Sequence, residues 1–231
     1  MRLVLASKSP ARRATLQAAG ITPVVLVSHV DEPAVLASLP GGRAFSGGGT
    51  TPGEEVGALA RAKCTTVADG LVSGSLGLPD VGIPERIVVV GCDSMLELDN
   101  RMLGKPHTPD VARARIAQMR GRDAVLWTGH HAVLLEGDGE SWARLDEGGA
   151  QASTVVRFGD ISDAEIDAYV ASGEPLKVAG SFTVDGLGGP FVEGVDGDYH
   201  SVVGLSLPLL RRMLVELGVF WPDLWDIRNR G

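Results

Sequence analysis

The stretch that decides the fold of this chain is residues 85–106, ERIVVVGCDSMLELDNRMLGKP. Its β-branched run at 87–90 is typical of a strand that is covered on both faces. We expect this strand to end at residues 91–93, so that Asp93 lies at its carboxyl end, where open α/β sheets bind their ligands. A carboxylate buried there is costly unless it is paired with a cation or bound to a metal. A lone Asp at this place can equally end a strand and cap a turn.

The remainder of the stretch predicts a small hairpin. Residues 95–98 form a second short strand, Asp99 and Asn100 form a turn, and residues 102–103 return. Lys105 follows, so a cation lies close in sequence to the carboxylate.

The composition is that of an ordinary globular protein. The chain has 231 residues, 44% apolar and 22% charged, which is enough for one sizeable core with room for a second lobe. The net charge is −8 and the basic residues are dispersed, so we expect no nucleic-acid partner. No apolar run approaches the roughly 20 residues of a membrane span and no signal peptide is recognisable, so we expect no membrane either. The two cysteines, Cys64 and Cys92, favour a reducing cytoplasm over a disulfide framework.

A strand, a turn and a helix open the chain. A helix is expected at residues 10–19, with Ser9 as its N-cap. The turn offers hydroxyls and cations to an anion, from Ser7, Lys8 and Arg12. The same features also describe a well-capped helix with a solvated basic end.

A second helix is expected at residues 54–69, and it places a lysine on its apolar face. Lys63 lies on the same side as Val56, because seven residues return to within roughly 20° at 3.6 residues per turn. Lys63 either extends past the edge of the core or contacts a ligand. Before this helix, Asp31 and Glu32 form an acidic pair that follows a strand, a pattern that is also common where a helix begins.

The rest of the chain alternates strands and helices with glycine-rich connections. We expect loops at 40–53 and 70–84, strands at 23–27, 153–158 and 181–184, a hairpin end or loop at 136–149, and helices at 109–119, at 163–173 and from Pro208 onward.

Two details of these elements bear on function. Residues 124–135 have a strand pattern that is interrupted at 128–131, and His130 and His131 there are unsuited to one metal ion because adjacent strand residues point to opposite faces. In the tail, Trp221 and Trp225 either pack on the core or cover a subunit contact.

The dispersed polar residues form a set with a common chemistry. Phosphate-ester chemistry needs cations that neutralise phosphate oxygens, and carboxylates that hold a divalent ion or position a water molecule. The chain offers both kinds at strand ends and turns: Ser7, Arg12, Lys63, Lys105 and Lys177 as donors and cations, and Glu32 and Asp93 as carboxylates.

The chain resembles the Maf family (septum-formation inhibitor Maf), whose members are nucleoside triphosphate pyrophosphatases. The similar stretches occur in the family's order and span nearly the whole chain: LASKSPARRATLQAAGI at 5–21, SHVDE at 28–32, ALARAKC at 58–64, GCDSMLELDNRMLGKP at 91–106, TG at 128–129, and EPLKVAGSFTVDGLGGPFVEGVDGDYHSVVGLSLPLL at 174–210.

This resemblance implies a fold and an activity. The fold is α/β, with a long mixed central sheet flanked by helices and two lobes with a nucleotide cleft between them, in a single domain at 1–218 followed by a tail at 219–231. The activity is hydrolysis of a nucleoside triphosphate, normal or modified, to the monophosphate and pyrophosphate with a divalent cation, Mg²⁺ or Mn²⁺. The family is also described as homodimeric, cytoplasmic and linked to restraint of cell division.

The resemblance also implies roles for individual residues. Asp93 matches the proton acceptor, and acts with Lys63 and Lys105 in catalysis. Glu32 and Asp93 match the metal-binding carboxylates. The expected phosphate-binding residues are Ser7, Arg12, Arg13 and Lys177.

Three positions depart from the family's usual pattern, and they concern the base. Ala11 stands where an arginine is usual, Ser94 where a threonine is usual, and Asp185 where a glutamine is usual. Members that prefer pyrimidine triphosphates carry the usual residues, so this chain is expected to differ from them in specificity.

Two other functions compete with the enzyme. One is a nucleotide-binding regulator of septum formation and cell division without significant catalysis, and the other is a nucleic-acid-binding protein. The intact set of carboxylates and lysines favours the enzyme, because a pure binding protein needs no positioned base. The acidic net charge and the absence of a basic stripe disfavour nucleic-acid binding.

Overall fold

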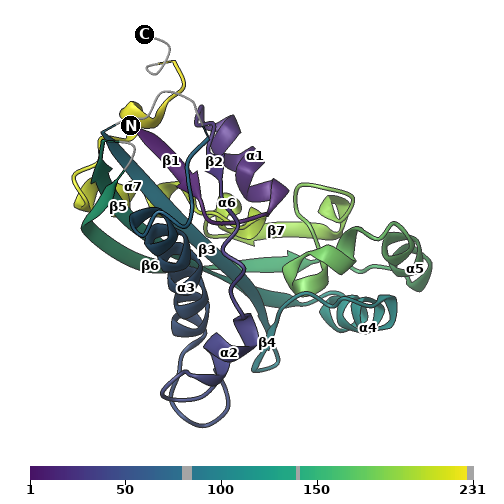
Figure 1. The fold of residues 1–231 in the computed structure, drawn as a ribbon. Helices are drawn as coiled ribbons and strands as arrows, with labels where there is room; N and C mark the ends of the chain where they lie inside the picture. Colours follow the sequence, from purple (N-terminus) through teal and green to yellow (C-terminus); the bar gives the residue numbers. More distant parts are fainter. Residues whose placement is uncertain (80–84, 139–140, 228–231) are drawn as a thin grey trace.

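Strand β3 (Arg86–Leu98) is the central element of the fold (Figure 1). The computed structural model describes residues 1–79, 85–138 and 141–227. Within it, β3 is one continuous strand of 13 residues. Strand β5 (Asp123–Gly137) pairs antiparallel with β3 at every position from Arg86 to Glu97. The prediction of two short strands is therefore wrong, and Asp93 lies in the interior of one long strand.

Gly91 explains why the sequence suggested a strand end. A Cβ atom at position 91 would lie 2.4 Å from the carbonyl oxygen of Ala60 and 2.7 Å from the backbone nitrogen of Cys64, both in helix α3 (Pro52–Val72). The glycine therefore allows the helix to pack directly on a continuing strand. Gly129 in β5 does the same beneath Val56, so the predicted interruption of that strand at 128–131 is also wrong.

Among the described residues the sheet is mixed and has seven strands. Their order is β2-β1-β3-β5-β6-β7, and β4 pairs with β3 outside this path. Strand β1 (Arg2–Leu5) is parallel to β2 (Val24–Val25) and to β3, whereas the other pairs are antiparallel. The remaining strands are β4 (Arg101–Leu103), β6 (Trp142–Phe158) and β7 (Val192–Asp196).

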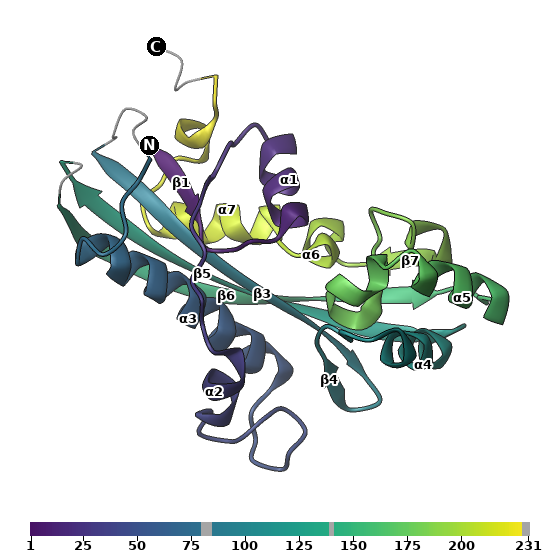
Figure 2. The same cartoon turned by 45° about the vertical axis from the view of Figure 1, so that its right-hand side comes forward.

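Helices cover both faces of this sheet, as Figure 2 shows. Helix α3 lies on one face, and α1 (Pro10–Ala18) and α7 (Leu207–Glu216) lie on the other. The other helices are α2 (Glu32–Ala37), α4 (Pro109–Met119), α5 (Asp163–Ala171) and α6 (Tyr199–Val203), with short 3₁₀ turns η1 (Glu174–Lys177), η2 (Ala179–Ser181), η3 (Gly189–Phe191) and η4 (Trp221–Leu224). The expected α/β fold with a long mixed sheet flanked by helices is confirmed, while its division into two lobes with a nucleotide cleft stays a prediction.

Most helix boundaries follow the predicted caps. The Ser9 hydroxyl accepts from the backbone of Arg12 at the start of α1, and Ser162 forms the predicted capping box with Glu165 on α5. Helix α3 extends beyond the predicted 54–69 because Thr51 caps it three residues earlier, with Pro52 at its first position. Helix α4 begins as expected after Thr108, although the Thr108 side chain makes no capping hydrogen bond.

The shorter strands differ more from expectation. The strand predicted at 23–27 is reduced to β2, and the one predicted at 153–158 is the end of the much longer β6. Residues 136–137 and 142–149 therefore lie in the paired ends of β5 and β6, as expected for the end of a hairpin. Residues 181–184 form no strand, because Gly180 takes a left-handed φ of 72° within η2 and turns the chain. Residues 80–84, 139–140 and 228–231, which belong to the predicted loops and tail, lie outside the described residues.

Four apolar clusters flank β3 in the part of the chain that the structure describes, and two polar residues, Asp93 and Ser94, separate them. On one face Val90 and Cys92 belong to the cluster beneath α1 and α7, whereas Leu96 belongs to the cluster with α4 and α5, and Ser94 lies between. On the other face Val89 belongs to the cluster beneath α3, whereas Met95 belongs to a smaller one with Leu59. Asp93 lies between these two. Between Ile87 and Leu96 the strand is thus apolar except at Asp93 and Ser94 in its middle.

The tail packs on the core. Val219 and Leu224 are buried in the same cluster as α7, and Trp221 and Trp225 pack against it. Asp226 accepts hydrogen bonds from the backbone and hydroxyl of Thr22. Of the two alternatives for the tail tryptophans, the structure shows packing on the core.

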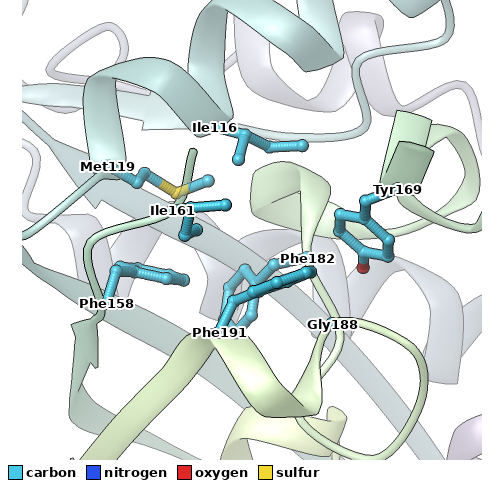
Figure 3. Close-up of a pocket in the computed structure, with 8 residues that line it drawn as sticks. All are labelled: Ile116, Met119, Phe158, Ile161, Tyr169, Phe182, Gly188 and Phe191. Carbon is cyan, nitrogen blue, oxygen red and sulfur yellow. The ribbon is translucent and has the colours of Figure 1, made fainter. Parts of the chain in front are cut away.

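A cavity near α4 and α5 is too small for a nucleotide. It encloses about 10 Å³ and is lined by the apolar side chains that Figure 3 shows. Tyr169 contributes the one polar side chain, and its hydroxyl accepts from the backbone nitrogen of Thr183. This space is a gap in core packing. Within the described residues, no helix combines the length and the apolar character needed to cross a membrane.

Candidate active site

The candidate site lies where β3 has an open edge. On this edge β1 pairs with β3 as far as Val90, and β4 pairs with it from Leu96 onward. Between them, no strand of the described residues pairs with residues 91–95 on this side, because β5 occupies the opposite edge. The loop between β1 and α1 passes beside this gap (Figure 2). The parallel strand whose carboxyl end faces the site is therefore β1, followed by Ser7, and not β3.

Lys63 connects the two candidate carboxylates. Its Nζ atom lies 2.5 Å from Oδ1 of Asp93 and 2.7 Å from Oε1 of Glu32. The side chains of Lys63 and Asp93 are 13% and 10% exposed, whereas that of Glu32 is 51% exposed. The lysine on the apolar face of α3 therefore pairs with two carboxylates, and three predicted site residues are brought together.

The two carboxylates differ in their ionisation. Burial raises the pKa of Asp93 above its ordinary value, although the charges of Lys63 and Arg12 oppose this. Partial burial also acts to raise the pKa of Glu32, but the hydrogen bond and charge of Lys63, with the charges of Lys105 and Arg12, hold it below its ordinary value. Glu32 is therefore the more firmly ionised of the two, and Asp93 is the better proton acceptor.

Lys105 and Lys8 add cations on the open side. Lys105 is exposed, yet partial desolvation, followed by the charges of Lys8, Arg12 and Lys63, lowers the pKa of its ammonium, while Glu32 opposes the shift. Lys8 belongs to this group. The turn beside Ser7 offered it to an anion from the sequence, although it was left out of the residues expected to bind phosphate.

Arg12 is held by the protein on three sides. Its Nε donates to the carbonyl of Gly204 at 2.7 Å, and its Nη1 donates to the carbonyl of Cys92 at 2.8 Å and to Ser7 Oγ at 3.2 Å. Its Nη2 donates to Ser94 Oγ at 3.2 Å. A guanidinium has five N–H donors, so one remains for a ligand. Arg12 thus joins α1, the open edge of β3 and the turn after α6.

Other predicted site residues lie apart from this group. Arg13 is exposed on α1, and Lys177 is exposed at the end of η1. Ala11 is half-buried in the first turn of α1. Among the described residues, no hydrogen bond or ion pair connects them with Asp93.

Asp185 is exposed on the turn before η3. The backbone N–H groups of Leu187 and Gly188 in this turn donate to the carboxylate of Glu174. Glu174 therefore caps the turn, and Asp185 does not. Asp185 is left exposed, and its contact with a base stays a prediction.

The carboxylates suit a metal that takes part of its coordination from a substrate. The described residues contain no group of three or more histidine, cysteine or acidic side chains that could hold an ion. Asp93 and Glu32 nevertheless converge on one point, the Nζ atom of Lys63. Mg²⁺ is commonly bound by one or two carboxylates together with phosphate oxygens and water. The two residues fit such a site only once a polyphosphate is bound.

The paired histidines lie on opposite faces of β5. His130 is buried, and its Nε2 accepts from the backbone nitrogen of Ser206 before α7. His131 lies on the α3 face, with Nε2 3.9 Å from Glu147. Their separation agrees with the expectation that they cannot share an ion.

Fold and site together define an α/β protein that binds a small polyanion beside a carboxylate able to accept a proton. The cations surround the open edge of β3, and the buried acid lies in its middle. The chain belongs to the Maf-like protein family, whose family model matches residues 2–217.

Curated proteins similar to this chain carry one name. A protein of Nocardia farcinica is 52% identical over 226 residues, which cover 96% of each chain, and is named nucleoside triphosphate pyrophosphatase. Proteins with the same name from Streptomyces coelicolor and Cutibacterium acnes are 49% and 47% identical, and the matches cover 97% and 96% of this chain and 94% of each relative.

Proposed function

We propose that this chain is a nucleoside triphosphate pyrophosphatase. A water molecule attacks a phosphorus atom of the α–β phosphoanhydride, its proton passes to the Asp93 carboxylate, and the bridging P–O bond breaks. The products are the nucleoside monophosphate and pyrophosphate. The names of relatives that match nearly the full length support this assignment.

The observation that carries the proposal is the position of Asp93. It is a buried carboxylate with a raised pKa in the middle of β3, held by Lys63 at the open edge of the strand. A general base works best when its pKa approaches the operating pH, and burial moves Asp93 in that direction. Lys105, Lys8 and the remaining donor of Arg12 would neutralise phosphate oxygens.

A divalent cation, Mg²⁺ or Mn²⁺, belongs to the proposal. Glu32 and Asp93 would hold it together with oxygens of the triphosphate, and the ion would supply neutralisation of the charge that develops on the leaving pyrophosphate. Lys63 now occupies the space between the carboxylates, so its ammonium would move toward the phosphates.

The base specificity is proposed to differ from a strict preference for dTTP and UTP. An ionised Asp185 only accepts hydrogen bonds and favours bases that present donors, such as guanine or cytosine. Ala11 leaves more room than an arginine for a larger or modified base. Measuring kcat/KM for UTP, dTTP, CTP and GTP on the wild type and on Asp185→Gln tests this. An unchanged ranking would remove Asp185 from base recognition.

The activity itself is tested by following pyrophosphate and monophosphate across a panel of normal and modified triphosphates. We expect the two products in equal amounts, with release that depends on Mg²⁺ or Mn²⁺ and stops on chelation. Asp93→Asn is the matched control for a contaminating hydrolase. Release of orthophosphate in place of pyrophosphate, or binding without turnover, would contradict the proposal.

A homodimer in the cytoplasm completes the proposal. Residues 142–154 of β6 have an outer edge without a partner strand among the described residues, and such an edge can pair with another chain. Both cysteines are free and buried, which fits a reducing compartment. Light scattering coupled to size-exclusion chromatography tests the dimer, and cell fractionation tests the location.

A further inference from the structure

A line of hydrogen bonds crosses the sheet behind the open edge of β3. Arg12 Nη2 lies 3.2 Å from Ser94 Oγ, and Ser94 Oγ lies 3.0 Å from Thr128 Oγ1 on β5. Thr128 Oγ1 lies 3.0 Å from the carbonyl oxygen of Ser201 in α6. Thr128 is fully buried, so water does not compete for the protons at its hydroxyl.

The end of this line fixes the direction of every proton in it. The carbonyl of Ser201 can only accept, so the single hydroxyl proton of Thr128 points toward it. The bond between the two hydroxyls must then be donated by Ser94. At the other end, Arg12 can only donate, so Ser94 accepts from it. The proton of Ser94 is committed to Thr128, and Ser94 offers a ligand one acceptor lone pair and no donor.

Ser7 has the opposite hydrogen-bonding role to Ser94, because it can donate to a ligand. Its Oγ accepts from the backbone nitrogen of Ser9 and from Arg12 Nη1, each at 3.2 Å. Both lone pairs of this hydroxyl are occupied, so its proton is available to an acceptor. Arg12 therefore lies between a serine that can donate to a ligand and a serine that can only accept from one.

These polarities orient a nucleotide in the site. Ionised phosphate oxygens carry no protons, so they can bond to Ser7 but not to Ser94. The acceptor at Ser94, which is only half-buried, requires an N–H or O–H group. In a nucleoside triphosphate such donors belong to the base and the sugar. The phosphates thus lie toward Ser7 and the nucleoside toward Ser94.

We propose that Thr128 is a positioning residue that makes Ser94 an obligatory hydrogen-bond acceptor and thereby selects bases that carry an exocyclic amine. This inference rests on the proposed pyrophosphatase activity and deepens it by naming the substrate class. A ribose hydroxyl at Ser94 would be common to CTP and UTP, so a difference between these two substrates reports contact with the base, because position 4 carries an amine in cytosine and a carbonyl oxygen in uracil. The carbonyl would face the lone pair of Ser94 without a hydrogen bond.

The test compares kcat/KM for CTP with that for UTP in the wild type, Thr128→Val and Thr128→Ser. Valine keeps the shape of threonine but frees the Ser94 proton, so Ser94 can donate to a carbonyl as well. We expect the wild type to prefer CTP by about tenfold or more, the value that one unmade hydrogen bond predicts, and Thr128→Val to lose most of this preference. Thr128→Ser retains the hydroxyl and should retain the preference.

The outcomes separate this inference from the activity on which it rests. A wild type that prefers UTP, or a folded Thr128→Val protein with an unchanged ratio, would overturn the inference while pyrophosphate release continues. Absence of pyrophosphate release from every triphosphate would instead reject the proposed function. The melting temperature of Thr128→Val reports the cost of losing the Thr128 hydrogen bond to the Ser201 carbonyl, which keeps the backbone nitrogen of Gly204 as a donor. If that variant does not fold, Ser94→Ala removes the acceptor directly and must reduce the preference for CTP in the same way.

Discussion

The Nζ atom of Lys63 lies 2.5 Å from Oδ1 of Asp93, and this contact joins helix α3 to the central strand at the buried acid on the face that α3 covers. The contact depends on close packing, since α3 approaches β3 at Gly91, two residues before the acid. The same ammonium also holds Glu32 at the start of α2. One lysine thus positions both carboxylates that the chemistry requires.

Asp93→Asn is expected to abolish most turnover while preserving the fold. Asparagine keeps the shape but cannot accept the proton from water, and general-base catalysis typically contributes about 10²–10⁴-fold to rate. Lys63 retains Glu32 as a partner, and burial already disfavours the charge of Asp93, so stability should change little. Pyrophosphate release and the melting temperature should be measured together. Wild-type rates in a well-folded variant would remove Asp93 from catalysis.

Lys63→Met and Lys105→Met should differ from each other. Removing Lys63 leaves Asp93 buried without its paired cation, a change that costs up to about 3–5 kcal/mol and reduces both stability and nucleotide affinity. Lys105 is exposed, so Lys105→Met should weaken nucleotide binding without a change in melting temperature. Calorimetric affinity for a non-hydrolysable triphosphate and thermal unfolding distinguish the two effects. Lys177→Met, on an exposed turn, tests whether η1 contributes to binding. Unchanged affinity in Lys105→Met would reject its role as a phosphate ligand.

The sequence predicted the local elements better than their pairing. Ser9 and Ser162 mark the starts of α1 and α5 because caps act within one turn of the chain. Lys63 was correctly placed on the core face of its helix, for the same local reason. The continuity of β3 could not be inferred, because Gly91 and Asp93 are usual signals for the end of a strand. Their meaning here depends on α3, which is distant in sequence.

In the candidate site, too, the residues could be predicted from the sequence but their contacts could not. Its lysines and acids were identified, but the partners of Arg12 come from segments that are far apart in the chain. No local pattern could show that four of the five guanidinium N–H groups donate to the protein itself. The role of Thr128 was equally hidden, since only its register opposite Ser94 reveals it.

Acid should destabilise the protein partly through His130. Burial, followed by the charge of Arg12, lowers the pKa of His130 from 6.5 to about 4, although the backbone of Thr128 and the charge of Asp198 oppose this. The unfolded chain therefore binds the proton first, so this contribution to stability is complete above about pH 6.5 and is lost as the pH falls toward 4. The shift corresponds to roughly 3 kcal/mol.

His130→Gln isolates this contribution from the other titrating groups. The glutamine carbonyl can accept from the backbone of Ser206 as the imidazole does, but it does not titrate. Urea unfolding at pH 8 and pH 4.5 gives the free energy of unfolding for each protein. The decrease with acid should be smaller in the variant, and equal decreases in both proteins would show that His130 is not the group responsible.

Gly91→Ala should separate α3 from β3 and thereby affect both stability and activity. The added methyl group would lie 2.4 Å from the Ala60 carbonyl oxygen and 2.8 Å from Cys64 Cβ, distances that require the helix to move. Overpacking of this kind costs about 1–3 kcal/mol. Because Lys63 lies between these two contacts on α3, its distance to Asp93 should increase and turnover should fall.

Gly148→Ala is the matched control, since it is also a strand glycine and the added atom meets only Leu217 at 3.8 Å. The melting temperature and the rate of pyrophosphate release should therefore both fall in Gly91→Ala, and neither should change in Gly148→Ala. A Gly91→Ala protein as stable and active as the control would show that the close approach of α3 does not set the geometry of Lys63 and Asp93.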